Sequence, residues 1–193
     1  MLDVAIIGCG VVGAAAAYEL SHYPLHVAVL EAENDVADGT TKANSAILHA
    51  GYDPEPGTQM ARLNVQGVAL AKEICARLDV PYRQCVSPWE FALAMAEVAV
   101  RNGVELYRST PVTNIEKIDG GWQLTTPDGS FAARYVVNAA GLNAQAIHEM
   151  AAPHTFTLEP TRGEYYLLDK SEGNRVNHVI FQCPNENGKG VLV

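Results

Sequence analysis

Three glycines and one acidic residue near the start of the chain have the types and spacing needed to hold a diphosphate. Gly8, Gly10 and Gly13 lie within six residues, and Glu31 follows Gly13 by 18 residues. In such a turn the first glycine permits a tight bend, the second lets the backbone approach a pyrophosphate, and the third lets a helix pack closely on a strand. A carboxylate about 20 residues further on accepts hydrogen bonds from a ribose diol and repels a 2′-phosphate. The pattern predicts a dinucleotide site and disfavours NADP.

The elements around these residues support that prediction. Residues 4–7 form an apolar run typical of a strand, residues 14–20 a helix that is apolar on nearly all sides, and residues 26–30 a second strand that ends in Glu31. Strand, glycine turn, helix and strand within about 30 residues make one βαβ unit. The free N–H groups at the start of the helix then face the phosphates. A glycine turn that serves only helix–sheet packing is the alternative interpretation.

A second segment extends the candidate site. The loop from Thr40 to Gly51 is polar, ends in glycine and contains His49, and a simple NAD domain has no place for it. Such a loop could run beside the rest of an extended cofactor and bring His49 near its reactive ring. From the residues alone, a structural histidine satisfied by the backbone is the more frequent outcome.

Further along, two helices and several strands are predicted. One helix buries a face of residues spaced by three or four: Met60, Leu63, Gly67, Leu70, Ile74 and Leu78. Another begins with Ser87 as N-cap, Pro88 in the first turn and Glu90 to complete a capping box, and it ends at 102–103. Strands are predicted at 104–107, 112–118 and 135–138, with a glycine-turn hairpin around 123–131. After residue 150, stretches 159–168 and 178–182 suggest strands of a separate antiparallel sheet, without a further helix.

Composition and charge narrow the function classes. Hydrophobic residues make up 48% of the 193 residues, which indicates a globular protein. The net charge is −9 and no Lys/Arg cluster is present, so nucleic acid is not an expected partner. The four cysteines are scattered without a C-x-x-C pair, so we expect no metal site. No basic region precedes the first apolar run, which predicts a cytoplasmic protein, with peripheral attachment to the inner face of the membrane left open.

At this point the chain resembles a known family. It is similar to the FAD-dependent oxidoreductases of the D-amino acid oxidase superfamily, and within it to FAD-linked glycerol-3-phosphate dehydrogenases and L-2-hydroxyglutarate oxidases. The likeness covers essentially the whole chain and rests on these stretches: Gly8–Gly13 with Glu31, Lys42–Asp53, Ser87–Glu90, Asn138–Gly141 and Arg162–Tyr166. The Lys42–Asp53 and Arg162–Tyr166 stretches are the most specific.

The resemblance implies FAD as cofactor and a role for each matching residue. Those expected to bind FAD are Gly8, Gly10 and Gly13 at the pyrophosphate, Glu31 at the adenosine ribose, Thr41, Asn44 and Ser45 on the flavin side, Val112 beside the adenine, and Ala140 and Gly141 in a second loop. His49 and Arg162 are expected to face the substrate, with the Arg162 guanidinium as a possible anchor for a carboxylate or phosphate. A surface or interdomain ion pair is an equally weighted interpretation of Arg162.

The resemblance also implies a fold and shows two departures. The expected fold class is α/β: a Rossmann-like FAD-binding domain over residues 1–150, with a parallel sheet and β-meander, plus remnants of an antiparallel substrate domain over 151–193. In the family a sizeable substrate-domain segment separates the residues that match Cys85 and Val86, and the family chains continue past Val193. We therefore interpret the chain as a shortened form with weak or no turnover, whose exposed sheet edges favour self-association.

The implied reaction is oxidation of a small anionic 2-hydroxy compound. Glycerol 3-phosphate is the leading substrate and L-2-hydroxyglutarate the alternative. Hydride would pass from the C2–H bond to flavin N5 while a base takes the hydroxyl proton. Two other interpretations stay open, an NAD-dependent dehydrogenase and a non-catalytic dinucleotide-binding fragment. The electron acceptor and the base are not assigned.

Overall fold

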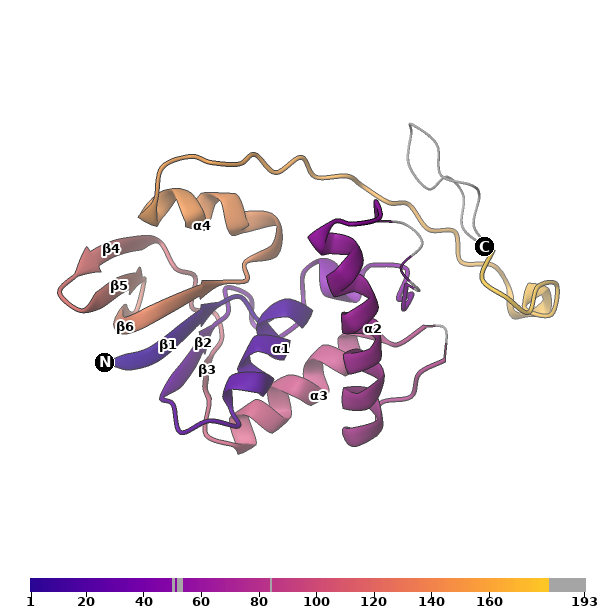
Figure 1. Ribbon diagram of the computed structural model, residues 1–193, viewed down its shortest axis with the longest axis horizontal. Helices are drawn as coiled ribbons and strands as arrows, with labels where there is room; N and C mark the ends of the chain where they lie inside the picture. Colours follow the sequence, from indigo (N-terminus) through magenta and orange to yellow (C-terminus); the bar gives the residue numbers. More distant parts are fainter. Residues whose placement is uncertain (50, 52–53, 84, 181–193) are drawn as a thin grey trace. The chain divides into compact units, whose positions relative to one another are not determined.

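The computed structural model describes residues 1–49, 51, 54–83 and 85–180 (Figure 1). The chain divides into two units, Met1–Pro160 and Thr161–Val193. Each unit is described by itself.

The first unit is built on one six-stranded sheet in the order β3-β2-β1-β6-β5-β4. Its strands are β1 (Leu2–Ile7), β2 (Val27–Leu30), β3 (Glu105–Tyr107), β4 (Asn114–Ile118), β5 (Gly121–Thr126) and β6 (Gly129–Asn138). β1 runs parallel to β2 and β6, and β2 runs parallel to β3. β4, β5 and β6 pair antiparallel as a meander. The predicted α/β class, with its parallel sheet and meander, is confirmed.

Alternation along β1 explains why both faces of the sheet are covered. Val4 and Ile6 pack in the apolar cluster that contains α1 (Val11–Leu20) and α3 (Pro88–Arg101). Ala5 and Ile7 pack on the opposite face, in the cluster that contains Leu124 of the meander. Successive strand residues point to opposite faces, so a strand that is apolar throughout must be buried on both sides. Figure 1 shows α1 and α3 together on one side and α4 (Ala144–Ala151) on the other.

Of the helices on the first face, α3 begins and ends where the sequence predicts, whereas α1 begins at Val11, three residues before the predicted start at Ala14. The Ser87 hydroxyl accepts a hydrogen bond from the Glu90 amide at 3.3 Å, and Pro88 opens α3. Gly103 follows the helix with φ +103°, a conformation that favours glycine and ends a helix. α1 is buried along Ala14, Ala17 and Tyr18, as expected for a helix without a polar side.

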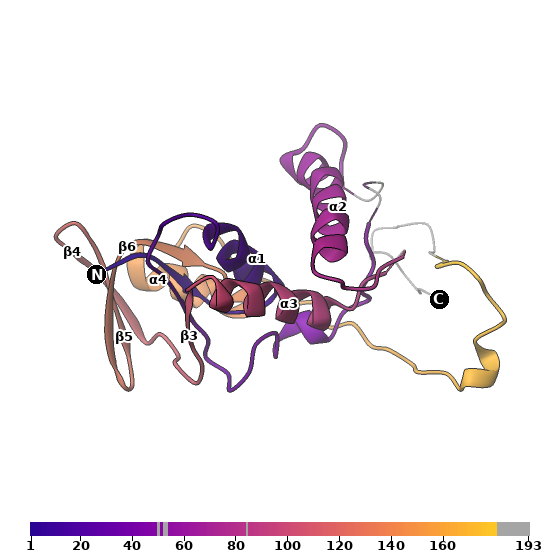
Figure 2. The ribbon, with the colours of Figure 1, turned by 90° about the horizontal axis from the view of Figure 1, so that it is seen from below.

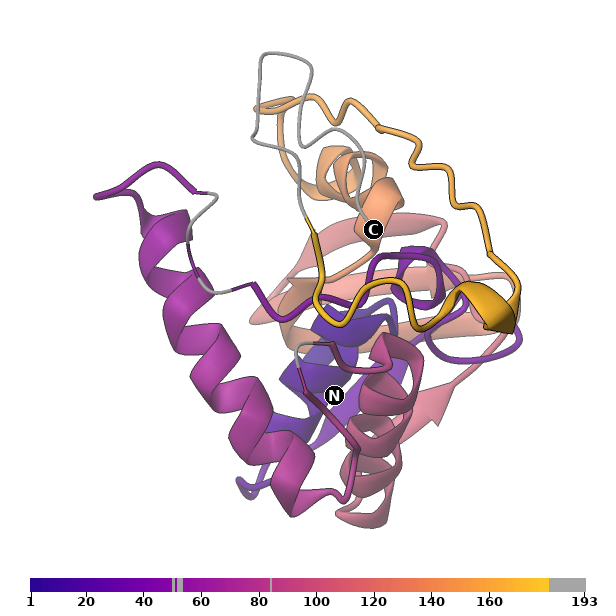
Figure 3. The same ribbon diagram turned by 90° about the vertical axis from the view of Figure 1, so that its right-hand side faces the viewer.

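The predicted inner face of α2 (Gln59–Arg77) is correct only near its C-terminal end. Ile74 is 4% exposed, but Met60, Leu63 and Leu70 are 70%, 49% and 48% exposed. In the first half of the helix the half-buried side chains are instead Ala61, Asn64 and Val68. Figures 2 and 3 show this half standing clear of α1 and α3. Within the described residues of the first unit, no element covers the apolar row of Met60, Leu63 and Leu70.

Further differences from the sequence predictions concern the meander, the segment after it and two short 3-10 helices. Residues 129–138 form one continuous strand rather than two runs, because Ala132 and Ala133 keep the pairing with β5. β4 begins at Asn114, so Val112 lies in the loop before the strand. α4 was not predicted. The short 3-10 helices η1 (Thr40–Lys42) and η2 (Gly141–Asn143) were not predicted either.

The second unit contains no strand among its described residues, 161–180. Its only regular element within that range is the short 3-10 helix η3 (Lys170–Glu172), which begins where the Asp169 carboxylate accepts from the Ser171 amide at 2.9 Å. The strand expected over residues 159–168 is therefore wrong for this structure. A strand needs a hydrogen-bonding neighbour, and Tyr166 and Leu167 are 87% and 102% exposed. Of the strand expected over 178–182, residues 178–180 are not in a strand and the rest lie outside the described residues.

Candidate functional site

The glycine turn between β1 and α1 leaves no room for side chains at two of its three glycines. Gly8 has φ +93°, and a Cβ atom there would lie 2.6 Å from the carbonyl oxygen of Ala139. A Cβ atom at Gly13 would overlap the carbonyl oxygen of Gly8. Both neighbours are backbone and cannot move aside cheaply, so these two glycines are explained by packing alone.

Gly10 differs from them. A Cβ atom at Gly10 would meet only the Thr41 hydroxyl, at 3.1 Å, and Gly10 lines an open cavity. Its lack of a side chain is therefore not required by helix–sheet packing. A bare backbone at the start of a helix, facing a cavity, is what close approach of a phosphate needs. The open space beside Gly10 is therefore the feature that favours a phosphate-binding turn over a turn that serves only helix–sheet packing.

Glu31, at the end of β2, is hydrogen-bonded to the glycine turn between β1 and α1. Its carboxylate accepts hydrogen bonds from the Cys9 amide at 2.6 Å and from the Glu33 amide at 2.9 Å, and the residue is 8% exposed. Each carboxylate oxygen keeps a second lone pair for another donor. Burial, with Glu31 and Asp35 nearby, raises the pKa of the Cys9 thiol to about 12, so Cys9 stays protonated and unreactive.

Thr41 supplies the helix cap that Gly10 cannot. As N-cap, Gly10 has no side chain to offer, and the Thr41 hydroxyl accepts from the Val11 amide at 2.9 Å instead. The Asn44 side chain in turn donates to the Thr41 carbonyl at 2.9 Å and accepts from the Ala46 amide at 2.8 Å. Asn44 thus fixes the turn that presents Thr41. Thr41 lines the cavity, whereas Asn44 and Ser45 are not among its lining residues.

These elements enclose one cavity of about 440 Å³. The predicted cofactor-binding residues that line it are Gly8, Gly10, Glu31, Thr41, Val112, Ala140 and Gly141. They come from five separate stretches of the chain. The parallel order β2-β1-β6 brings the ends of β1, β2 and β6, and with them Gly8, Glu31 and Ala140, to one edge of the sheet. Ligands of open α/β sheets bind at the carboxyl ends of parallel strands, which is where this cavity lies.

Backbone hydrogen bonds hold the outer parts of the cavity in place. The Thr110 amide donates to the Glu31 carbonyl at 2.8 Å, which brings Val112, 8% exposed, beside the acid. On the other side, the Ala139 amide donates to the Ile7 carbonyl at 2.9 Å and carries the chain from β6 to Ala140. Both tethers continue the sheet's own pairing beyond its last strand residues.

The first turn of α4 and its apolar face form a wall that the sequence reading missed. Leu142, Asn143, Ala146, Ile147 and Met150 line the cavity. The apolar residues at 142, 146, 147 and 150 repeat at intervals of three to four directly after the Ala-Ala-Gly run. That spacing was the signal from which the helix could have been found.

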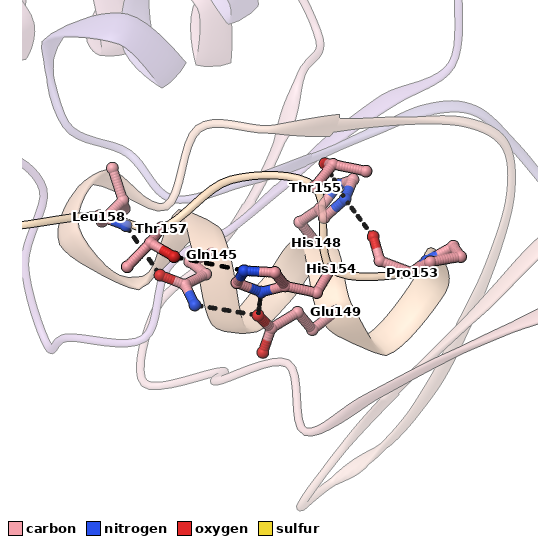
Figure 4. Close-up of polar contacts among 8 residues, drawn as sticks. All are labelled: Gln145, His148, Glu149, Pro153, His154, Thr155, Thr157 and Leu158. Atoms are coloured by element: carbon pink, nitrogen blue, oxygen red, sulfur yellow. Dashed lines mark hydrogen bonds and ion pairs between the residues drawn. The ribbon is translucent and has the colours of Figure 1, made fainter.

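The opposite side of α4 holds the chain that leaves it, residues 153–158 (Figure 4). The His154 Nδ1 atom lies 2.6 Å from the Glu149 carboxylate, and the Leu158 amide donates to the Gln145 side chain at 2.8 Å. His148 Nε2 lies 3.0 Å from the Pro153 carbonyl oxygen. Hydrogen bonds from His154 and Gln145 to the Glu149 carboxylate lower its pKa. α4 therefore contacts the cavity on one side and the following segment on the other.

A dinucleotide diphosphate fits the residues present. The first turn of α1 itself contains no acidic residue that would repel a phosphate from the positive end of the helix dipole. A cap hydroxyl, a buried carboxylate and an apolar wall surround the same cavity, and its volume lies within the usual range for small-molecule sites. Among the residues that the structure describes, no group of three metal-ligating side chains is present.

The two predicted substrate-facing residues are less closely defined. His49 is half-buried in the loop that follows η1, and that loop is anchored where Ile47 pairs with Cys85. Arg162 belongs to the second unit, where its guanidinium lies 3.8 Å from the Glu164 carboxylate and its side chain is 87% exposed. Their roles toward a substrate stay predictions.

Comparison with known proteins identifies the family. The model of the FAD-dependent oxidoreductase family matches residues 3–87 and 84–193. The chain belongs to the FAD-dependent oxidoreductase family. FAD is the cofactor of this family, and the resemblance in the sequence is confirmed.

Relatives within the FAD-dependent oxidoreductases refine this result. Glycerol 3-phosphate dehydrogenase of Caloramator mitchellensis is 40% identical, over all of this chain and 53% of its own length. Mitochondrial L-2-hydroxyglutarate dehydrogenase of Pongo abelii is 36% identical over 60% of this chain and 30% of its own. Dithionite-reduced L-alpha-glycerophosphate oxidase of Mycoplasma pneumoniae with FAD bound superposes with a TM-score of 0.67 at 24% identity, over 78% of this chain and 56% of that one, which shows the shared fold.

This member of the family spans about half the length of the Caloramator relative. Their alignment has 253 positions, 60 more than the 193 residues of the chain, and the family match falls into two parts that meet at residues 84–87. Within the described residues, no helix is both long and apolar enough to cross a bilayer.

Proposed function

We propose that the cavity binds the ADP half of FAD. Gly8 and Gly10 carry the backbone beside the pyrophosphate, Glu31 binds the adenosine ribose, and Thr41 offers its hydroxyl next to the phosphates. Val112 and Ala140 flank the nucleotide from the two outer loops. The observation that supports this most directly is Gly10, which lines an open cavity and at which a Cβ atom would meet no backbone atom, only the Thr41 hydroxyl at 3.1 Å.

The substrate proposed for the family chain is glycerol 3-phosphate. When bound, the flavin supplies a two-electron acceptor for the C2–H hydride. The guanidinium of Arg162 would pair with the substrate phosphate, since Arg forks well onto such groups. For His49 we propose, separately, a place facing the substrate. The Caloramator relative supports glycerol 3-phosphate over the whole chain, whereas L-2-hydroxyglutarate dehydrogenase matches a shorter part.

We further infer that residues 1–150 are the FAD-binding domain, that 151–193 are part of a substrate domain, and that a segment of that domain is missing between Cys85 and Val86. The two-part family match and the 60 additional alignment positions support a deletion at this point. Because the missing part would complete the substrate pocket, we expect cofactor binding without efficient turnover.

Flavin titration tests the first proposal. The purified chain is freed of flavin, FAD is added at increasing concentration, and binding is followed by quenching of flavin fluorescence. We expect a dissociation constant in the micromolar range or below. Preference for NADH over FAD would favour an NAD-dependent dehydrogenase, and no binding of either would favour a non-catalytic scaffold.

Anaerobic mixing with substrate tests the second proposal. Glycerol 3-phosphate and L-2-hydroxyglutarate are added separately to the FAD-loaded chain, and loss of the flavin absorption band is recorded. Slow bleaching by glycerol 3-phosphate alone is the expected result. Bleaching as fast as in an intact glycerol 3-phosphate dehydrogenase would refute the expectation that the shortened chain is weakly active.

Two partner predictions remain beside these. Attachment to a membrane surface stays a prediction that a vesicle flotation assay can test. Self-association through exposed strand edges also stays a prediction. β3 and β4 are the outer strands of the sheet, and such strands offer unpaired backbone groups.

A further inference from the structure

An apolar stripe on α2 lies outside the cofactor cavity and is not used by the proposed function. The α2 stripe consists of Met60, Leu63, Gly67 and Leu70. The three large side chains are 70%, 49% and 48% exposed, and a Cβ atom at Gly67 would meet no atom within 4 Å. Exposed apolar side chains that follow one another along one helix face form a candidate surface for contact with another segment.

The spacing of the α2 stripe is that of a helix seam. The intervals from Met60 through Leu63, Gly67 and Leu70 to Ile74 are three, four, three and four residues, the pattern of a helix that packs along its length. Ile74 is 4% exposed, so the same row is packed at one end and open at the other. Because one face of α2 is packed at Ile74 and exposed at Met60, Leu63 and Leu70, we interpret it as a packing interface of which only one end is covered.

Residues that the longer Caloramator relative contains, and this chain does not, belong close to the α2 stripe in the sequence. After α2, the segment turns back tightly: Tyr82 pairs with Val86, and the Arg83 amide donates to the Cys85 carbonyl at 3.0 Å. The two parts of the family match meet at residues 84–87, in this turn. The 60 additional positions of the Caloramator alignment are therefore best placed here, eight residues beyond the last residue of α2.

The small area of the α2 stripe favours contact with a segment of the same polypeptide over contact with a separate protein. From Met60 to Leu70 the helix rises about 15 Å, and a strip of this length and of about the width of the helix, roughly 10 Å, covers on the order of 150 Å². Stable complexes bury about 800 Å² on each partner. A covalently linked segment needs far less area, because its effective concentration is in the millimolar range.

We propose that the α2 stripe is the docking surface for the polypeptide that longer relatives carry between the positions of Cys85 and Val86. That polypeptide leaves the Tyr82–Val86 turn and lays an apolar face along α2. On the opposite side of α2, Val65 is 55% exposed and lies next to Gly51 of the loop that follows His49, where an added Cβ atom would be 2.6 Å from the Val65 side chain. α2 then forms a shared wall between the inserted segment and the His49 loop.

A chimera tests the proposal. The segment of the Caloramator enzyme that lies between the positions of Cys85 and Val86 is inserted into this chain, and a Gly/Ser segment of equal length is inserted as control. Hydrogen exchange of residues 60–70 is compared in the two proteins. We expect the natural insert to slow exchange at least tenfold and the Gly/Ser insert to leave it unchanged.

Lysine substitutions make the test specific to the α2 stripe. In the natural chimera, L63K/L70K is expected to abolish the protection, whereas A69K/A76K, on exposed positions of the opposite side, is expected to keep it. Equal exchange in both chimeras, or protection that survives L63K/L70K, would overturn the proposal. So would a dimer of the unmodified chain that L63K/L70K dissociates, because a second copy would then cover the row.

FAD titration and circular dichroism identify chimeras that do not fold. In that event exchange is measured in the intact Caloramator enzyme over the residues aligned with 60–70. Slow exchange there that is lost with lysines at the positions of Leu63 and Leu70 supports the proposal, and rapid exchange contradicts it.

Discussion

The β1–α1–β2 unit and α2 differ in how far their regularly spaced apolar residues are buried. In the first, Ile6 and Val29 are 0% and 2% exposed, as their strand pattern predicts. In the second, Leu63 and Leu70 belong to an equally regular helical pattern and are about half exposed. A periodic apolar pattern therefore specifies which face of an element can be buried, but burial occurs only where the chain also contains the covering partner.

The difference follows from where the partners lie. The βαβ unit has its nearest partners within about 30 residues of sequence, and α3 and β6 complete its two faces. The α2 stripe has no such partner among the described residues. In the second unit, Tyr166 and Leu167 show the same behaviour in an extended segment that no strand accompanies.

Alanine at two glycines should give the largest contrast between these regions. At Gly13 a Cβ atom would overlap the Gly8 carbonyl, so G13A should destabilise the fold by at least about 4 kcal/mol or prevent folding. At Gly67 the added methyl meets nothing, and G67A should stabilise α2 by up to about 1 kcal/mol. Urea unfolding of both variants measures the difference. Similar free energies of unfolding would contradict the close packing of the glycine turn.

Truncation of one leucine in each region should give the next largest contrast. Leu124 is fully buried, and L124A should lower the free energy of unfolding by about 3 kcal/mol. Leu70 is 48% exposed, and L70A should change it by less than about 0.5 kcal/mol. The same unfolding experiment decides the point. A large loss in L70A would mean that the α2 stripe is already covered in this chain.

Loss of the Glu31 charge should weaken cofactor binding more than it weakens the fold. In E31Q one side-chain oxygen must serve both the Cys9 and Glu33 amides, and the ribose loses a charged acceptor worth about 1.5–3 kcal/mol. We expect FAD to bind about 10- to 100-fold more weakly. E73Q changes an exposed glutamate on α2 that does not line the cavity and is the matched control. Equal affinity of E31Q and the unmodified chain would remove Glu31 from the site.

The smallest expected effect concerns acid and the segment held by α4. Hydrogen bonds from His154 and Gln145 keep the pKa of Glu149 below its ordinary value of 4.5. The stabilising contribution of this carboxylate is therefore complete above pH 4.5 and is lost as the pH falls through the lowered value. Amide exchange at residues 153–158, corrected for intrinsic rates, should rise in acid, and E149Q should flatten the profile. A profile identical in E149Q would show that Glu149 does not hold the segment.

Much of the fold and the centre of the site could be predicted from the sequence. The glycine turn, its flanking strands and Glu31 were predicted together because their interactions lie close along the chain and follow simple periods. The caps of α3 were predictable for the same reason, since Ser87 and Glu90 are three residues apart. The cofactor family followed from the more specific stretches of the resemblance, and the family match confirms it.

By itself, then, the sequence determined the βαβ unit, the acidic residue at its end and the family. Only the tertiary structure decided that Thr41 caps α1 from 30 residues away, that Asn44 holds Thr41 instead of lining the cavity, and that Ile147 and Met150 form its wall. It also decided that the α2 stripe faces outward. The physical reason is that periodicity and capping act within a few residues of chain, whereas the contacts of these residues depend on which distant elements fold against them.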